Sequence, residues 1–367
     1  MESNRKARMP WIIVILIVSL VLTFAFLFAL LIRGTKGGND FGSYKALAVP
    51  AGAQVQATGD GFVYYDGSTI ARVKASGKTA WTYLIGTNAT ISAGGTSVAA
   101  WSDETITLID MQSGVSTYSN AQGEPVQSVR VGEKYVAALL GSDADNTVVV
   151  LETGGKRVYE ADFNQQTVID YGFFSAGNLM WVMALDTTGS VPTCEITTYK
   201  PGNRRVVGLI SDTEQLMYNV TFQSTNIRCT GVTYLKAYDY TGTEDVAQRK
   251  LVYGWTLVSA DKGDDPMTAF VPTGQSDGTG TIKDVRMVRA GLDQTVRMPF
   301  PCRAIVARGD NVYGFSKDGH VMVATAGRQK VNAYAMSFEI DDVFGVTDDG
   351  AAVVRSGGTV YIISLGG

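Results

Sequence analysis

Short stretches of alternating apolar and polar residues, each followed by a glycine, recur along most of this chain. The stretch STIARVKASG reaches Gly77, and comparable stretches reach Gly114, Gly155, Gly202, Gly242, Gly291, Gly327 and Gly366. Alternation with a period of two predicts β-strands that bury one face, and a glycine directly after such a strand predicts a tight turn. Successive glycines lie 36 to 49 residues apart, a spacing typical of propeller blades with four strands each.

The pattern therefore predicts an all-β fold in which residues 44–367 form an eight-bladed β-propeller. Seven blades are the alternative if residues 217–301 contain an irregular unit. The residue four places after each glycine supports a common blade plan, because nearly every one suits a strand: Trp81, Tyr118, Tyr159, Val206, Val246, Thr295 and Val331. We expect these residues to open the outermost strands, and the three aromatic ones to pack against a neighbouring blade.

The two ends of the propeller sequence complement each other. The eighth copy stops at its glycine and supplies no fourth strand, whereas the alternating segment Tyr44–Val49 has no partner before the first blade begins near Gln54. We predict that Tyr44–Val49 completes the eighth blade and closes the ring, which would remove the exposed sheet edges.

A long apolar run, WIIVILIVSLVLTFAFLFALLI, precedes the propeller at residues 11–32. As a helix with ~1.5 Å rise per residue, it would span about 33 Å and cross a bilayer. The run is longer than the apolar core of a cleaved signal peptide, and no small-residue cleavage pattern follows it. We predict a cytoplasmic tail at 1–10, a transmembrane signal anchor at 11–32 and a linker at 33–43.

The flanking charges bear on orientation. Three basic residues precede the run and Arg33 and Lys36 follow it, which favours a cytoplasmic N-terminus. The propeller is therefore expected on the extracellular side of the cell membrane, and the bilayer is the expected partner of Trp11–Ile32.

The first copy, GFVYYDGSTIARVKASGKTAWTY, resembles the repeat of quinoprotein-type (PQQ-like) propellers, in which a strand, a glycine turn and a tryptophan follow one another. The order of basic tail, anchor and degenerate propeller resembles a domain family of membrane-anchored proteins from Gram-positive bacteria, which implies no assigned activity. Quinoprotein dehydrogenases would bring a cofactor on the propeller axis, a vicinal cysteine pair and an acidic base beside calcium. This sequence has no vicinal cysteines, and we expect no cofactor.

Few templates for chemistry are present. His320 is the only histidine, whereas zinc hydrolases and Ser-His-Asp triads need a histidine with positioned partners, so we interpret it as a residue beside a turn. Cys194, Cys229 and Cys302 are interpreted as buried thiols, with a Cys194–Cys229 disulfide as the alternative. The formal net charge of −4 is the opposite of the basic footprint that nucleic-acid binding requires.

Two long intervals between glycines place extra sequence at residues 186–193 and 259–280, and loops on a rigid scaffold commonly carry binding residues. The candidate binding residues are Asp186, Asp261, Lys262, Asp264 and Asp265. We predict no catalytic residues and no metal ligands. The expected function is a non-catalytic platform that binds an envelope protein or wall component; the alternative is an extracytoplasmic enzyme or ligand sensor that uses the central funnel.

Overall fold

The computed structural model describes residues 43–365 apart from 143–144, 175–176, 224–225 and 276–279. These residues belong to the second of two units into which the chain divides, Gly42–Gly367. The predicted tail and anchor, and the predicted linker up to residue 42, lie outside the described residues. Within the described part of the chain, no helix has the length and apolar character needed to cross a membrane.

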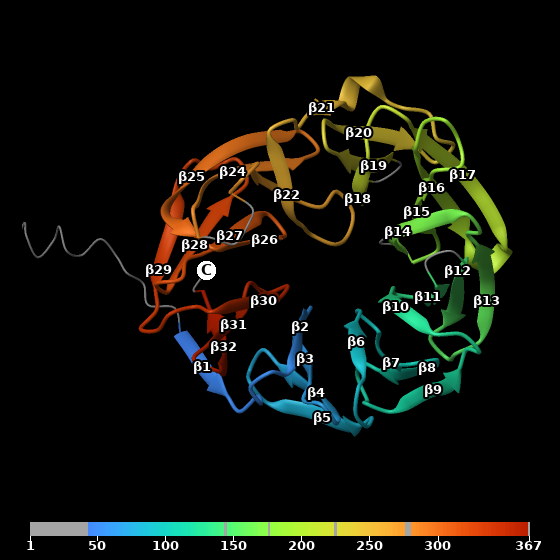
Figure 1. The fold of residues 1–367 in the computed structure, drawn as a ribbon. Coiled ribbons are helices and arrows are strands. Elements are labelled where there is room, and N and C mark those ends of the chain that lie inside the picture. The colour runs from blue at the N-terminus through green and yellow to red at the C-terminus, as the bar shows by residue number, and fades with distance from the viewer. Residues whose placement is uncertain (1–42, 143–144, 175–176, 224–225, 276–279, 366–367) are drawn as a thin grey trace, which may run out of the picture. The chain divides into compact units, whose positions relative to one another are not determined.

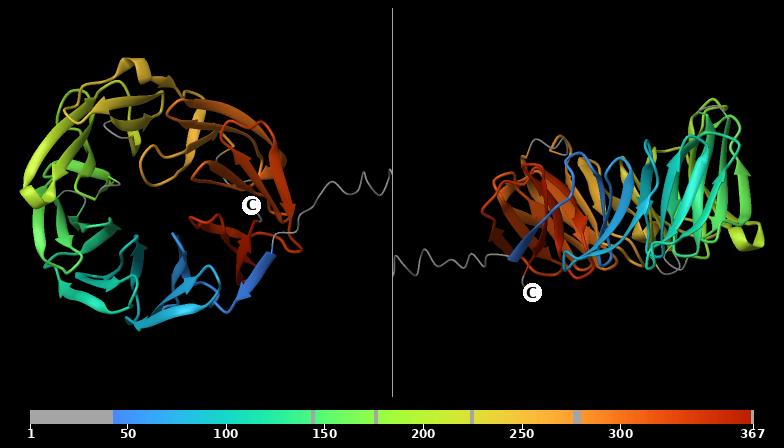
Figure 2. Two further views of the ribbon diagram at one scale, coloured as in Figure 1. Left: turned by 180° about the vertical axis from the view of Figure 1, so that it is seen from behind. Right: turned by 90° about the horizontal axis from the view of Figure 1, so that it is seen from below.

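The second unit is a ring of eight antiparallel four-stranded sheets (Figure 1 and Figure 2). In blades 1 to 7 the innermost strand comes first in the sequence and the outermost strand comes last. Blade 1 contains β2 (Gln54–Thr58), β3 (Gly61–Tyr65), β4 (Thr69–Lys74) and β5 (Thr79–Leu84). Blade 2 contains β6 (Thr90–Ala93), β7 (Ser97–Ser102), β8 (Thr105–Asp110) and β9 (Ser116–Ala121). Blade 3 contains β10 (Val126–Val131), β11 (Tyr135–Ser142), β12 (Asp145–Glu152) and β13 (Arg157–Asp162).

Blade 4 contains β14 (Gln166–Phe173), β15 (Met180–Asp186), β16 (Thr193–Lys200) and β17 (Arg205–Asp212). Blade 5 contains β18 (Met217–Gln223), β19 (Asn226–Gly231), β20 (Tyr234–Asp239) and β21 (Lys250–Leu251). Blade 6 contains β22 (Trp255–Ala260), β23 (Thr268–Pro272), β24 (Ile282–Arg289) and β25 (Leu292–Cys302). Blade 7 contains β26 (Ala304–Arg308), β27 (Asn311–Phe315), β28 (His320–Thr325) and β29 (Val331–Ala335). The eight-bladed prediction is confirmed and the seven-bladed alternative is wrong.

Blade 8 is built from both ends of the described chain. It contains β30 (Asp342–Val346), β31 (Ala352–Ser356), β32 (Thr359–Ser364) and, as its outermost strand, β1 (Ser43–Leu47). β1 pairs with β32 from Ser43 opposite Ser364 to Leu47 opposite Val360. The predicted closure is confirmed.

β1 also contacts blade 1. The Lys45 ammonium donates a hydrogen bond to the Ser76 carbonyl at 2.9 Å, and the Leu47 side chain lies against Gly77. One strand therefore completes blade 8 and seals its contact with blade 1.

The same contact between an outer strand and the next glycine turn recurs at two other places. Trp81 of β5 lies on Gly114 of blade 2 and donates from Nε1 to the Met111 carbonyl at 2.9 Å. Tyr118 of β9 lies on Gly155 of blade 3. Both glycines have positive φ, which L side chains rarely adopt. The predicted packing of these aromatic residues against neighbouring blades is confirmed.

Tyr159 of β13 follows the same plan with an aromatic partner, because its ring centroid lies 5.2 Å from that of Tyr199 in blade 4. Two copies depart from it. Gly202 lies in a 3-10 helix, Pro201–Asn203, and Arg204 adopts the positive φ instead. Val246 begins a second 3-10 helix, Val246–Gln248, so our expectation that it opens a strand is wrong.

Apolar clusters fill the interfaces between blades. In the described chain, each pair of adjacent blades shares one cluster of buried apolar side chains. A single twisted sheet cannot bury both faces alone, so this sharing stabilises the ring. The cluster between blades 5 and 6 has the fewest buried members of these clusters: Leu235, Val252, Phe270 and Val288. Cys194, Cys229 and Cys302 are buried free thiols, so the Cys194–Cys229 disulfide is not formed.

The turns define two faces of the ring. We call the side that carries the turns between first and second strands the AB face, and the side that carries the turns between second and third strands the BC face. Because adjacent strands are antiparallel, the turns between third and fourth strands also lie on the AB face, and the links between blades lie on the BC face. Ser43 and Ser364 pair at the AB face, so both ends of the described chain leave from that face (Figure 2).

Candidate functional site

The predicted binding residues do not form one site. Asp186 ends β15, so it lies on the BC face, whereas Asp261, Lys262, Asp264 and Asp265 follow β22 on the AB face. The segment 259–280 is also not one loop, because the buried strand β23 divides it into loops on opposite faces. Asp186 closes its own turn by accepting hydrogen bonds from the backbone N–H and hydroxyl of Thr188, at 2.8 and 2.7 Å.

Asp261 joins blade 6 to blade 7. Its carboxylate accepts from the Arg308 guanidinium at 2.9 Å and from the Gly309 backbone N–H at 2.7 Å. Arg308 also pairs with Asp348 of blade 8, and the backbone N–H of Asp348 donates to the Gly59 carbonyl of blade 1 at 2.8 Å. This chain of contacts links four consecutive blades, so Asp261 contributes to ring assembly.

Asp265 joins blade 6 to blade 5. Its backbone N–H donates to the Phe222 carbonyl at 2.9 Å, and its carboxylate lies 3.6 Å from the buried Arg228 guanidinium. Asp264, beside it, is exposed. The acidic residues of this loop therefore differ in role, and two of them hold blades together.

Lys262 lies in the loop that follows β22, the innermost strand of blade 6. This loop extends inward in Figure 1. The positive charges of Arg308 in blade 7 and Arg130 in blade 3 act to lower the pKa of Lys262, and the negative charge of Asp261 acts to raise it. The surrounding protein, together with these two cations, lowers the pKa of Lys262, although its side chain remains exposed to solvent. Arg130 is paired with Asp170 at 3.2 Å.

His320 begins β28 directly after a turn, as interpreted from the sequence. Its ring stacks on Phe300 at a centroid distance of 3.8 Å, and Nδ1 lies 3.2 Å from the Asp318 carboxylate. Among the described residues, no group of three or more His, Cys, Asp or Glu side chains is placed to hold a metal ion.

A cluster of exposed apolar side chains lies on the BC face of blade 5. We call it the blade 5 patch: Leu216, Val232, Leu251 and Tyr253, whose exposed fractions are 46%, 52%, 58% and 75%. Leu216 and Val232 are joined by a backbone hydrogen bond of 3.3 Å, and the backbone N–H of Val252, between Leu251 and Tyr253, donates to the Thr233 carbonyl at 2.9 Å. Three chain segments are thus tied together, and each presents apolar groups to solvent.

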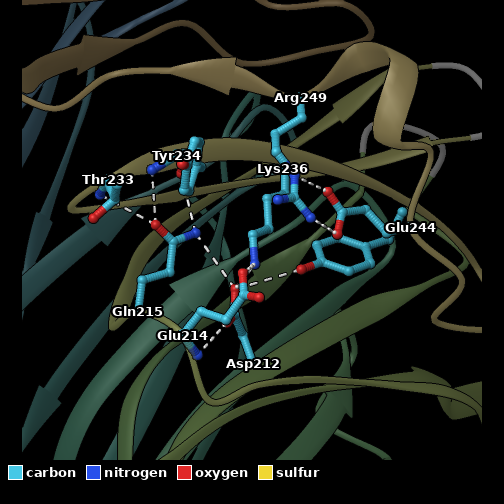
Figure 3. A network of polar contacts seen from close by, with 9 residues as sticks. Asp212, Glu214, Gln215, Thr233, Tyr234, Lys236, Glu244 and Arg249 are labelled. Atoms are coloured by element: carbon cyan, nitrogen blue, oxygen red, sulfur yellow. Dashed lines mark hydrogen bonds and ion pairs between the residues drawn. The ribbon is translucent and has the colours of Figure 1, made fainter.

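A buried polar network beneath this patch fixes its backbone (Figure 3). Gln215 is buried, and its Oε1 accepts from the backbone N–H groups of Thr233 and Tyr234 at 3.1 and 2.8 Å. Its Nε2 donates to the Tyr234 carbonyl at 3.2 Å. One side chain in the link between blades 4 and 5 therefore holds the turn that carries Val232.

An ion pair anchors the same network. Lys236 of β20 and Asp212 of β17 are almost fully buried and lie 2.9 Å apart, and Lys236 also contacts Glu214 at 2.7 Å (Figure 3). Burial alone would raise the pKa of Asp212, but its hydrogen bond with Lys236 and that residue's charge lower it overall. Arg249 and Glu244 form a second pair at 2.7 Å. Ion pairs therefore stabilise the backbone beneath the blade 5 patch, whereas the side chains that the patch exposes are mostly apolar.

Sequence reasoning missed this patch because its four residues are isolated apolar positions in three segments. A signal is present in hindsight: the turn and linker sequences EQLM, TGVTY and KLVYG place large apolar residues where solvated turns usually have polar ones.

Known structures share the architecture. The C-terminal WD40 domain of Sif2 matches with a TM-score of 0.61 at 13% identity, over 89% of this chain and 99% of that one. BamB from Moraxella catarrhalis matches with a TM-score of 0.52 at 12% identity, over 88% and 96%. A europium-containing methanol dehydrogenase matches with a TM-score of 0.50 at 10% identity, over 85% and 84%.

At these identities the similarity shows the propeller fold alone, and one of the matched proteins is an enzyme. No protein-family model matches this sequence, and no similar curated protein was found.

Proposed function

We propose that this protein is a membrane-anchored, extracytoplasmic platform that binds another protein of the cell envelope through the blade 5 patch, without catalysing a reaction. The observation that carries the proposal is the convergence of Leu216, Val232, Leu251 and Tyr253 on one exposed surface. Contiguous exposed apolar groups on a soluble surface are typical of protein-binding sites.

The make-up of the patch supports a protein partner. Tyr253 is the most exposed of the four side chains, and tyrosine is enriched among residues that dominate binding energy at interfaces. The buried contacts of Gln215 hold the patch backbone before any partner arrives, so little conformational entropy would be lost on binding.

The patch and the start of the described chain lie on opposite faces of the ring. The described chain begins at Ser43 on the AB face, whereas the patch lies on the BC face.

Site-specific crosslinking in cells tests the proposal. A photoreactive residue at position 253 of the full-length chain should yield a discrete adduct with another envelope protein. The matched control is position 246, which is 65% exposed but belongs to the AB side of blade 5, and it should not yield that adduct. Leu251→Ser should reduce the adduct severalfold, because it removes apolar area from the patch.

Two outcomes would contradict the proposal. Equal adducts from positions 253 and 246 would show that the patch has no preference for a partner. An adduct formed only with a second copy of this chain would make the patch a self-association surface.

One observation favours the alternative of an enzyme or ligand sensor that uses the ring axis. Lys262 has a lowered pKa and lies in the exposed loop after the innermost strand of blade 6, and lysines with lowered pKa are candidates for acid-base or covalent chemistry. The charged neighbours Asp261, Arg308 and Arg130 are already paired within the ring, so we rank this alternative second.

A further inference from the structure

A cleft of about 590 Å³ lies between blades 1 and 2 and opens on the BC face. Its size falls in the range of small-molecule sites. We propose that this cleft binds a saccharide, one or two sugar units of a glycan chain. The proposal goes beyond protein binding by the blade 5 patch and does not depend on it.

The cleft exists because blade 2 presents small side chains toward blade 1. Thr105, Thr107, Ser119 and Ala121 line this side of the sheet. On the opposite side of the same sheet, Ile106 and Leu108 are buried against blade 3. Small residues on one face only leave space that the outer strand of blade 1 does not fill.

The floor of the cleft offers hydroxyl groups. Thr107 is 4% exposed, and its Oγ1 lies 2.9 Å from Ser119 Oγ. A hydroxyl carries one donor and two acceptor positions, so this pair retains one donor and several acceptors after its mutual bond. Such paired donor and acceptor capacity matches the hydroxyl groups of a sugar.

The walls and rim complete the match. Tyr83 of blade 1 forms one wall and presents an apolar ring with a polar hydroxyl, and Leu84 beside it is 76% exposed. Asp103 and Glu104 form the turn at the rim, and neither carboxylate joins an ion pair within the described chain. Carboxylates accept strong hydrogen bonds from hydroxyl donors.

A cationic peptide is the competing ligand, because it would also be attracted by the two rim carboxylates. We favour a saccharide because the floor is neutral and built from hydroxyls. A lysine or arginine side chain would place its methylene stem against these hydroxyls, and it has no acceptor for the remaining donor of Thr107 and Ser119.

Calorimetric titration of the full-length chain, held in a detergent without sugar groups, tests the proposal. The probes are chitotetraose, cellotetraose and tetralysine. The variants are Asp103→Asn and Glu104→Gln, which remove charge without shortening the side chain. Asn tolerates the positive φ of 50° at position 103. Glu339→Gln, at an exposed residue in the link between blades 7 and 8, controls for the change in net charge.

We expect at least one oligosaccharide to bind, and each rim variant to weaken it roughly ten- to hundredfold, the loss expected for a charge-assisted hydrogen bond. Glu339→Gln and the patch variant Tyr253→Ser should bind it like the wild type, which separates this site from the proposed protein-binding function. The proposal is overturned if neither oligosaccharide binds, if the rim variants bind them unchanged, or if tetralysine alone binds.

Discussion

At the scale of single residues, glycines decide how closely neighbouring blades approach. Gly155 lies in the turn between the third and fourth strands of blade 3, with φ of +87°, and the Tyr118 ring of blade 2 occupies the space where a side chain would project. Gly291 holds the equivalent turn of blade 6 with φ of +66°, and open space surrounds it. Both positions have a left-handed backbone that would strain any L side chain, and they differ in what lies beside them.

We predict that Gly155→Ala lowers the free energy of unfolding by about 2–5 kcal/mol, and Gly291→Ala by only about 1–2 kcal/mol. Both substitutions carry the cost of a left-handed backbone, but only alanine at 155 must also displace the Tyr118 ring. Urea denaturation of both variants measures the difference. Equal losses would show that the ring contact at Gly155 contributes nothing.

The buried hydroxyl of Tyr171 makes stability sensitive to alkaline pH. Tyr171 of blade 4 donates to the Ser128 carbonyl of blade 3 at 2.8 Å and accepts from the Leu139 backbone N–H at 3.2 Å. Burial raises the pKa of Tyr171 to about 12 from 10. The folded state therefore favours the protonated phenol, and this stabilisation is present below pH 10 and lost as the pH rises toward 12.

A shift of this size corresponds to about 2–3 kcal/mol. We expect unfolding free energies measured between pH 9 and about 12 to fall, and Tyr171→Phe to flatten part of that fall. Some slope should remain, because burial also raises the pKa of Tyr199 to about 12. A Tyr253→Phe control, at an exposed residue, should keep the full slope; an identical slope in both variants would argue against the role of Tyr171.

At the scale of elements, we expect loss of the strand β1 (Ser43–Leu47) to lower the stability of the propeller strongly. It completes blade 8, and Tyr44 packs edge-on against Phe338 at a centroid distance of 5.0 Å. A chain that starts at Pro50 should lose several kcal/mol relative to one that starts at Gly42, because it exposes the edge of β32 and apolar surface of blades 8 and 1. Thermal melting of the two truncations tests this, and equal melting temperatures would contradict it.

The elements also show which predictions a sequence can support. Alternation ahead of a glycine identified the third strand of each blade and, in blades 1 to 7, the turn after it, because both depend on local residues such as Gly77. The outermost strand of blade 5 was predicted wrongly: β21 has two residues, and a longer connection with a 3-10 helix replaces the rest. β23 was also missed, because a strand buried on both faces has no alternation to detect.

At the scale of the whole molecule, fold and site differ in how they are encoded. The number of blades follows from a repeated local pattern, so the sequence predicts it well. The candidate site depends on where separate turns meet: Asp186 and Asp261 proved to lie on opposite faces, and Leu216 and Tyr253 came together from links that flank blade 5. The tertiary structure decides which turns lie side by side, and no regular spacing of residues in the sequence predicts it.

The pairing of Ser43 with Ser364 has a further consequence for biosynthesis. The ribosome makes β1 before β32, so β1 waits unpaired while blades 1 to 7 are translated. Contacts between residues so distant in sequence form slowly. We therefore expect the ring to close only after β32 has been made, and a chain that stops before β32 to leave blade 8 unfinished and open to proteolysis.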